Sequence, residues 1–170
     1  GKGMFRRRFQ DLARSVEEAQ YSSERGSISE EEAFEGICDL LSQVQREKGV
    51  VYVIGNGGSA GIASHFSCDL IKTLKIPSLT FYDSNLMTCL GNDLGYENVF
   101  RYPLSQLLKP QDLLVAISSS GKSPNIVLAA ELCASRQIPL ITLSGFSAEN
   151  PLRKLGTINL WVDRAGYGLV

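Results

Sequence analysis

The feature that most constrains the fold is a series of apolar runs that begins at residue 50. Each run is continuous, and most are rich in β-branched residues or leucine, as in strands buried on both faces of a sheet. The runs are VVYVI (50–54), LTFY (79–82), LLVAI (113–117), PLITL (139–143) and TINLWV (157–162). Segments with helical features lie between them, at 59–74, 97–108, 124–135 and 151–155. Strands that alternate with helices predict an α/β domain with a five-stranded parallel sheet flanked by helices.

Two further helices are predicted before the first strand. In the first, apolar residues recur at spacings of three and four, at Phe5, Phe9, Leu12, Val16 and Ala19. A polar linker at 22–27 follows, and Ser29 then begins the second helix, with Glu32 completing a capping box. Because both helices precede the first strand, they are not crossovers between strands. We expect them to cover a sheet edge or to pack on another subunit.

The predicted organisation is a helical segment over residues 1–48 and one α/β domain over residues 49–170. The basic side chains at 6–8 are interpreted as a solvated helix face or an oligomer contact rather than as a nucleic-acid arm. Folds of this kind usually place a covering helix after the last strand, and the sequence given ends at Val170. We therefore expect that C-terminal helix to be absent from this chain.

Composition narrows the classes of partner. Seventeen basic and eighteen acidic side chains give a net charge of -1, which does not favour a nucleic-acid or membrane partner. The four cysteines lie far apart and form no CxxC pair, so we interpret them as buried free thiols of a cytoplasmic protein. The single histidine, His65, excludes a histidine-rich metal site made by this chain alone.

Polar, glycine-rich segments follow the first three predicted strands. Gly55–Ser59 follows the first strand, Gly91–Asp93 lies in the connection after the second, and Ser118–Ser123 follows the third. Ligands of parallel α/β sheets bind beyond the carboxyl ends of the strands. Glycines let the backbone approach a ligand, and hydroxyls together with a helix N-terminus can hold a phosphate. These segments predict a site for a phosphorylated small molecule.

Two other interpretations of these loops are weaker, and either loop can also be a purely structural turn. The spacing Gly55-x-Gly57-x-x-Ala60 fits a dinucleotide fingerprint, and Asp83 imitates the ribose-binding acid of that class. The serine-rich loop is not part of that fingerprint, however. The segment from Ala116 nearly matches a P-loop but lacks its first glycine. We therefore expect no nucleotide cofactor.

Three segments, in this order and spacing, carry a resemblance to a known family. GNGGSAGIASHF (55–66), GND-GY (91–96) and SSSGKS (118–123) resemble the phosphoheptose isomerases of the sugar isomerase (SIS) domain superfamily. The resemblance covers nearly the whole chain and implies a SIS, flavodoxin-like fold. It also implies a homotetramer with sites between subunits, in which the two N-terminal helices serve oligomerisation.

The resemblance implies a role for each matching residue. The sugar-phosphate site would be lined by Asn56, Gly57, Gly58 and Ser59. The phosphate would be held by Ser118, Ser119, Ser120 and Ser123. The sugar hydroxyls would be contacted by Asn92 and Asp93. His65 and Asp69, four residues apart, share one helix face. In the family these positions carry His and Glu; the carboxylate acts as acid/base, and both residues bind zinc in some members. Asp69 is one methylene shorter, by about 1.5 Å, and His65 can also be a helix residue packed at an interface.

The function implied is carbohydrate metabolism by an aldose–ketose isomerase. It would convert sedoheptulose 7-phosphate to a manno-heptose 7-phosphate through an enediol, with Asp69 as base and His65 polarising the carbonyl or binding zinc. A second acid/base is expected on the missing C-terminal helix. The alternative is a SIS module that binds a sugar phosphate without turnover, as a regulator or adaptor. An initiator-associating SIS protein is a third, less favoured interpretation.

Overall fold

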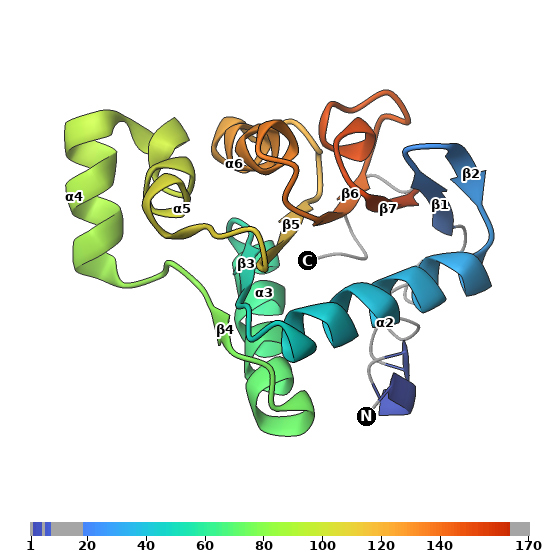
Figure 1. The fold of residues 1–170 in the computed structure, drawn as a ribbon. Helices are drawn as coiled ribbons and strands as arrows, with labels where there is room; N and C mark the ends of the chain where they lie inside the picture. The colour runs from blue at the N-terminus through green and yellow to red at the C-terminus, as the bar shows by residue number, and fades with distance from the viewer. Residues whose placement is uncertain (1, 5, 8–18, 164–170) are drawn as a thin grey trace.

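A seven-stranded sheet is the central layer of the molecule. The computed structural model describes residues 2–4, 6–7 and 19–163 (Figure 1). The strands, in the order β2-β1-β7-β6-β5-β3-β4, are β1 Ala19–Ser23, β2 Gly26–Ile28, β3 Val51–Ile54, β4 Ser78–Leu79, β5 Leu113–Ser118, β6 Leu140–Gly145 and β7 Ile158–Val162. Strands β3 to β7 are parallel, which confirms the predicted parallel sheet.

Helices cover both faces of this sheet (Figure 1). One face packs on α2 (Glu30–Arg46), α3 (Gly58–Asp69) and a π-helical turn, η1 (Leu70–Leu74). On the other face, α6 (Pro124–Ser135) contacts β5 and β6, and the 3-10 turn η3 (Leu152–Lys154) contacts β6 and β7. Beside them, α5 (Arg101–Leu107) contacts α6, and α4 (Ser84–Leu94) contacts the 3-10 turn η2 (Tyr96–Asn98); both helices add side chains to the same apolar core. Alternate residues of β5 enter the two cores, Val115 on one side and Leu114 on the other, because side chains alternate along a strand.

Residues 19–28 differ from the prediction. The expected polar linker is instead a β-hairpin, in which β1 pairs antiparallel with β2 and also with β7. Gly26 adopts a positive φ of 112° in this hairpin, and Tyr21 packs edge-on against Phe34 of α2. The sheet therefore has seven strands rather than five, and part of the segment 1–48 extends it. The other residues predicted in the first helix lie largely outside the described residues.

The start of α2 follows the prediction. The Ser29 side chain accepts a hydrogen bond from the Glu32 backbone N–H at 3.1 Å, and its hydroxyl also contacts the Glu32 carboxylate at 3.1 Å. This capping satisfies a donor that the first helical turn leaves unpaired. The buried face of the helix, which includes Phe34, Ile37 and Leu41, then packs on the sheet.

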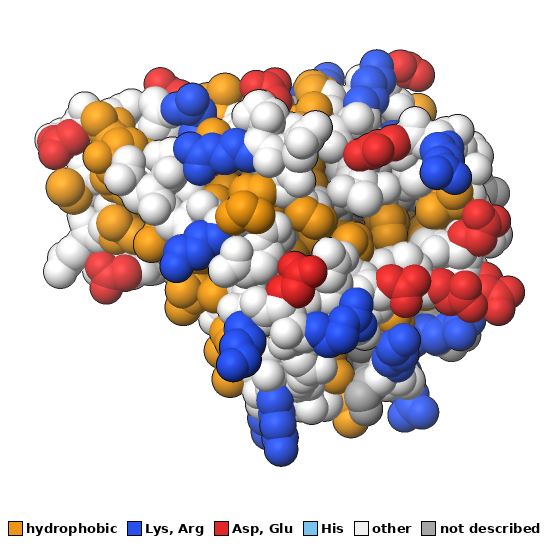
Figure 2. All heavy atoms as spheres, viewed as in Figure 1, with side chains coloured by type: hydrophobic (Ala, Val, Ile, Leu, Met, Phe, Trp, Pro, Cys, Tyr) orange, Lys and Arg blue, Asp and Glu red, His pale blue; other side chains and the backbone are white. Residues whose placement is uncertain are grey.

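Helix α4 was not predicted, because a connection was expected there. Asp83 caps this helix by accepting a hydrogen bond from the Leu86 N–H at 3.0 Å, so its carboxylate has a structural role at the start of α4. Within the part of the chain that the structure describes, no helix is long and apolar enough to cross a membrane. On the face seen in Figure 2, Lys and Arg side chains are interspersed with Asp and Glu.

The four cysteines are free, as predicted, but they are not all buried. Cys133 is buried, and burial raises the pKa of its thiol to about 12. Cys68 and Cys89 are exposed on α3 and α4, and Cys38 is half-buried, so the prediction of burial is correct for Cys133 alone.

A buried carboxylate fixes the amino end of the central strands. Asp112, which is 3% exposed, precedes β5 and accepts hydrogen bonds from the Val50 N–H and the Lys109 N–H, both at 2.8 Å. It thereby ties the entry of β3 to the entry of β5. The strands are then held in register along the edge opposite to the glycine-rich loops.

We predict that Asp112→Ala lowers the free energy of unfolding by about 1–3 kcal/mol, because two N–H groups lose their acceptor. Urea denaturation followed by circular dichroism measures this. Glu24→Ala, in the exposed turn between β1 and β2, is the control and should change stability by less than about 0.5 kcal/mol. Equal stability of the two variants would contradict this role of Asp112.

Candidate active site

The order of the strands locates the candidate site. From β3 the chain moves outward to β4 and then returns to the other side of β3 to form β5, β6 and β7. The loops after β3 and β5 therefore leave neighbouring strands in opposite directions. Such a switch point opens a crevice at the carboxyl ends of the two strands, where ligands of open α/β sheets bind. Both loops predicted to bind ligand, 55–59 and 118–123, lie there.

The loop after β3 requires glycine at two positions. A side chain at Gly55 would lie 2.7 Å from the Ser59 carbonyl oxygen, and Gly57 has a φ of +54°. The loop is therefore a tight turn that delivers the chain directly into α3. Gly57 and Gly58 are exposed, whereas Ser59 is buried. The exposed backbone leaves room for a ligand to approach it closely.

An amide pair joins the two loops. Asn56 Nδ2 donates to Asn125 Oδ1 at 2.9 Å, and Asn125 Nδ2 donates back to Asn56 Oδ1 at 2.8 Å. Asn125 lies in the first turn of α6 and is 2% exposed. Sequence reasoning missed it, although an asparagine among the apolar residues of this helix was a signal. The structure thus brings the two predicted loops together through side chains 69 residues apart.

Two tyrosines complete this network. The Tyr82 hydroxyl donates to the Gly55 carbonyl at 2.6 Å, and burial raises the pKa of this phenol to about 12, so it stays protonated as a donor. The exposed Tyr96 hydroxyl lies 3.4 Å from Asn56 Oδ1. Neither residue was predicted. Tyr82 had no distinguishing sequence signal, whereas Tyr96 belongs to the GND-GY segment.

The serine-rich loop after β5 is held by its own side chains. The Gly121 N–H donates to both the carbonyl and the hydroxyl of Ser118 at 3.1 Å, and Gly121 has a φ of +67°. The Lys122 N–H donates to Ser120 Oγ at 3.1 Å, and the Ser118 hydroxyl reaches that of Ser123 at 3.3 Å.

The remaining groups of this loop are open to a ligand. Ser119 is half-buried, and its hydroxyl bonds to none of the residues that the structure describes. Ser123 precedes α6 but does not cap it with its side chain, and Lys122 is exposed. Hydroxyls, a lysine and the N-terminus of a twelve-residue helix are groups that bind a phosphate.

His65 and Asp69 face each other on α3, as their spacing predicts. His65 Nε2 lies 3.6 Å from Asp69 Oδ2, with the His65 side chain 67% exposed and that of Asp69 22% exposed. Among residues 2–4, 6–7 and 19–163, no group of three or more His, Cys, Asp or Glu could hold a metal ion. A zinc site needs at least three protein ligands, so the described residues do not by themselves fit a bound zinc ion.

Asn92 and Asp93 lie in the last turn of α4, not in a loop. Both are exposed, and Asn92 Nδ2 donates to Asp93 Oδ1 at 3.1 Å, while Asp93 Oδ2 lies 3.6 Å from the Cys89 sulfur. The polar contacts of both side chains are therefore made within their own helix. In this segment it is Tyr96 that reaches the loop after β3.

Known proteins resemble this chain in sequence. The model of the SIS domain family matches residues 16–145. Phosphoheptose isomerase of Bordetella avium is 35% identical over 120 residues, which cover 67% of this chain and 61% of that protein. That of Alkalilimnicola ehrlichii is 36% identical over 120 residues, which cover 65% of this chain and 61% of the relative. The chain thus spans about three-fifths of the length of these curated relatives.

Solved structures resemble it as well. Phosphoheptose isomerase GmhA from Neisseria gonorrhoeae superposes with a TM-score of 0.69 and 29% identity, covering 78% of this chain and 74% of that one. A phosphoheptose isomerase from Francisella tularensis gives a TM-score of 0.71 and 27% identity, covering 78% and 73%. The family match extends over well over half of the chain and includes both ligand loops. The chain therefore belongs to the SIS domain family.

Proposed function

We propose that this chain is an aldose–ketose isomerase that converts sedoheptulose 7-phosphate to a manno-heptose 7-phosphate. The observation that carries the proposal is the pair of ligand loops joined at the switch point by Asn56 and Asn125. The curated relatives reported above are phosphoheptose isomerases, which supports the choice of substrate class.

In this proposal the serine loop holds the phosphate. Ser118, Ser119, Ser120 and Ser123 supply hydroxyls and backbone N–H groups, and the N-terminus of α6 supplies favourable dipoles. Fixing the phosphate fixes the distance of C1 and C2 from α3. The loop after β3, with Asn56, Gly57, Gly58 and Ser59, borders the sugar, and Asn92 and Asp93 are the proposed contacts to its hydroxyls.

Isomerisation moves one proton between neighbouring carbons. Asp69 takes a proton from C1 of the ketose while the C2 carbonyl oxygen is protonated, which gives the enediol. A proton is then returned to C2 as the O1 hydroxyl loses its proton and the C1 carbonyl forms. His65, beside Asp69, polarises the carbonyl. The second acid/base is assigned to a residue outside the described part of the chain or on a neighbouring subunit.

The assembly proposed is a cytoplasmic homotetramer with sites between subunits. Hydrophobic side chains gather at the left of the face in Figure 2, where α4 and α5 lie. Leu94, Tyr102 and Leu107 on these helices are 40–45% exposed. Exposed apolar side chains of this kind are suited to cover by another subunit. Zinc remains a candidate cofactor only with ligands beyond the described residues.

Isomerase activity is tested by proton exchange at C1 and C2 of sedoheptulose 7-phosphate in deuterated buffer, with and without added zinc. We expect Asp69→Asn to reduce exchange by about 100-fold or more, because a positioned base contributes roughly that factor. Asp39→Asn, on an exposed part of α2, is the matched control and should exchange normally.

Two other results of this experiment are informative. Saturable binding of the sugar phosphate without exchange would support the alternative function, a binding module that acts as regulator or adaptor. Exchange that persists in Asp69→Asn would remove Asp69 from the mechanism while leaving the isomerase activity established.

We further predict that Ser119→Ala weakens binding of sedoheptulose 7-phosphate roughly tenfold or more, since a hydrogen bond to a charged group contributes about 1.5–3 kcal/mol. Isothermal calorimetry measures the Kd. Ser135→Ala, which removes a hydroxyl bonded to the Leu132 carbonyl at the far end of α6, is the control. Equal Kd values for the two variants would place the phosphate elsewhere.

A further inference from the structure

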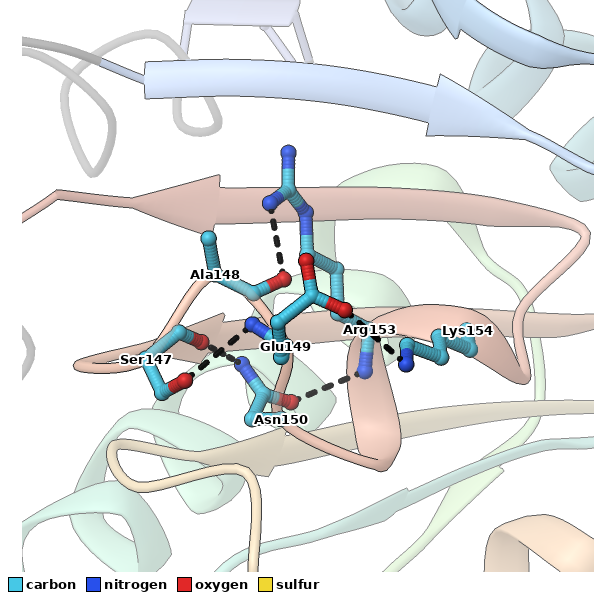
Figure 3. Close-up of polar contacts among 6 residues, drawn as sticks. All are labelled: Ser147, Ala148, Glu149, Asn150, Arg153 and Lys154. Atoms are coloured by element: carbon cyan, nitrogen blue, oxygen red, sulfur yellow. Dashed lines mark hydrogen bonds and ion pairs between the residues drawn. The ribbon is translucent and has the colours of Figure 1, made fainter.

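A buried asparagine lies at the centre of the loop that follows β6. Asn150 has 0% of its surface exposed, although its neighbours Ser147 and Glu149 are exposed. Figure 3 shows its side chain between Ser147 and the backbone of Arg153. The loop after β6 lies beside the serine loop, because β6 and β5 are adjacent parallel strands. No role in the site follows for Asn150 from the sequence motifs.

The Asn150 amide bonds in several directions at once. Its Nδ2 lies 3.1 Å from Ser144 Oγ, 3.1 Å from the Gly145 carbonyl and 3.0 Å from the Ser147 carbonyl. Its Oδ1 accepts from the Arg153 N–H at 2.9 Å. The position needs a group that both donates and accepts without charge. An aspartate would face the two carbonyl oxygens with a buried negative charge, which is costly.

The same side chain closes on the serine loop. A Cβ at Gly121 would overlap the Oδ1 and Cγ atoms of Asn150, so the Gly121 backbone rests directly against the amide. The Leu152 N–H also donates to the Gly121 carbonyl at 3.1 Å. Gly121 is the residue whose N–H closes the serine loop onto Ser118. The loop after β6 therefore fixes the position of Gly121, the residue that closes the turn of the serine loop.

Other contacts attach the loop after β6 to the rest of the fold. The Arg153 guanidinium donates to the Ala148 carbonyl at 3.0 Å, as Figure 3 shows, and to Gln20 Oε1 of β1 at 3.0 Å. The same guanidinium lies 4.5 Å from the centre of the Trp161 ring. Lys154 and Glu149 form an ion pair at 3.1 Å. The segment is thus attached to β1 and β7 as well as to the serine loop.

We propose that Asn150 is a positioning residue, which acts through Gly121 to keep the serine loop in the conformation that binds the substrate phosphate. This inference rests on the proposed function, because it takes the serine loop to be the phosphate site. Hydrogen bonds weaken steeply with distance and misalignment. A small shift of Gly121 would therefore disturb several phosphate contacts together, although Asn150 itself touches no ligand.

The chain offers a closely matched control. Asn159 is 3% exposed, bonds through its amide to Thr142 and to the backbone of Gly156, and packs against Gly156 as Asn150 packs against Gly121. It lies near the amino ends of β6 and β7, away from the ligand loops. Loss of its side chain should affect stability in a similar way without moving the serine loop.

The experiment compares Asn150→Ala with Asn159→Ala, each confirmed to be folded by circular dichroism. We expect Asn150→Ala to weaken sedoheptulose 7-phosphate binding tenfold or more by calorimetry and to raise KM far more than it lowers kcat. Amide exchange of Gly121 should also become faster. Asn159→Ala should bind sedoheptulose 7-phosphate with a Kd within twofold of that of the wild-type protein. If Asn150→Ala does not fold, Asn150→Ser takes its place with the same expectations.

A double-variant cycle separates positioning from general destabilisation. If Asn150 acts through the serine loop, the loss caused by Asn150→Ala becomes smaller in a Ser119→Ala background, so the two losses do not add. Additive losses, or a Kd for Asn150→Ala equal to that of Asn159→Ala, would overturn the inference while the proposed function stands. Failure of the unchanged protein to bind the sugar phosphate would instead overturn the proposed function.

Discussion

The reciprocal amide pair between Asn56 and Asn125 is the interaction on which the arrangement of the site depends. A switch in strand order opens a crevice but does not by itself fix the two loops that border it. Each hydrogen bond of the pair contributes about 0.5–1.5 kcal/mol net, and breaking one partner leaves a largely buried group unsatisfied. The pair therefore specifies the relative position of α3 and α6 more than it adds stability. Because α3 carries His65 and Asp69 and α6 begins at the serine loop, the amide pair also sets the distance between the proposed acid/base residues and the proposed phosphate loop.

The proposed acid/base pair on α3, His65 and Asp69, is less enclosed than the amide pair. His65 and Asp69 lie one helical turn apart on α3, and the His65 side chain is mostly exposed in the single chain. An isomerase needs a low-dielectric, water-excluding site, so the proposed chemistry requires cover from a neighbouring subunit or from residues outside the described part. Because the Asp69 carboxylate is one methylene shorter than that of Glu, the covering residues must also hold the substrate closer to α3, since proton transfer depends on sub-ångström placement.

How much could be read from the sequence depended on whether a feature was local. Strands β3, β5, β6 and β7 were predicted because their apolar runs report burial directly, and the Ser29–Glu32 cap because both partners lie within one turn. The strand expected at 79–82 was placed too late, because β4 is only Ser78–Leu79 and its Leu79 is exposed. The β1–β2 hairpin was missed because AQYSS and GSI contain mostly polar or small residues, and only pairing with β7 makes them strands. Helix α4 was missed because glycine, asparagine and aspartate near its end suggest a loop. The partners of Tyr82, Asn125 and Asn150 are set by tertiary packing, so no spacing rule could reveal them.

The residues that hold the site share one chemical property. Asn56, Asn125 and Asn150 each donate and accept hydrogen bonds and carry no charge. Near a phosphate that carries about two negative charges, a buried aspartate in any of these places would repel the ligand and would itself be destabilised by burial. A lysine or arginine would compete with the serine loop for the anion. Neutral amides avoid both effects, so the attraction of the ligand is left to the helix N-terminus, the serine hydroxyls and the exposed Lys122. In the proposed function, this division explains how a chain with a net charge of -1 binds a phosphate without an arginine in either loop.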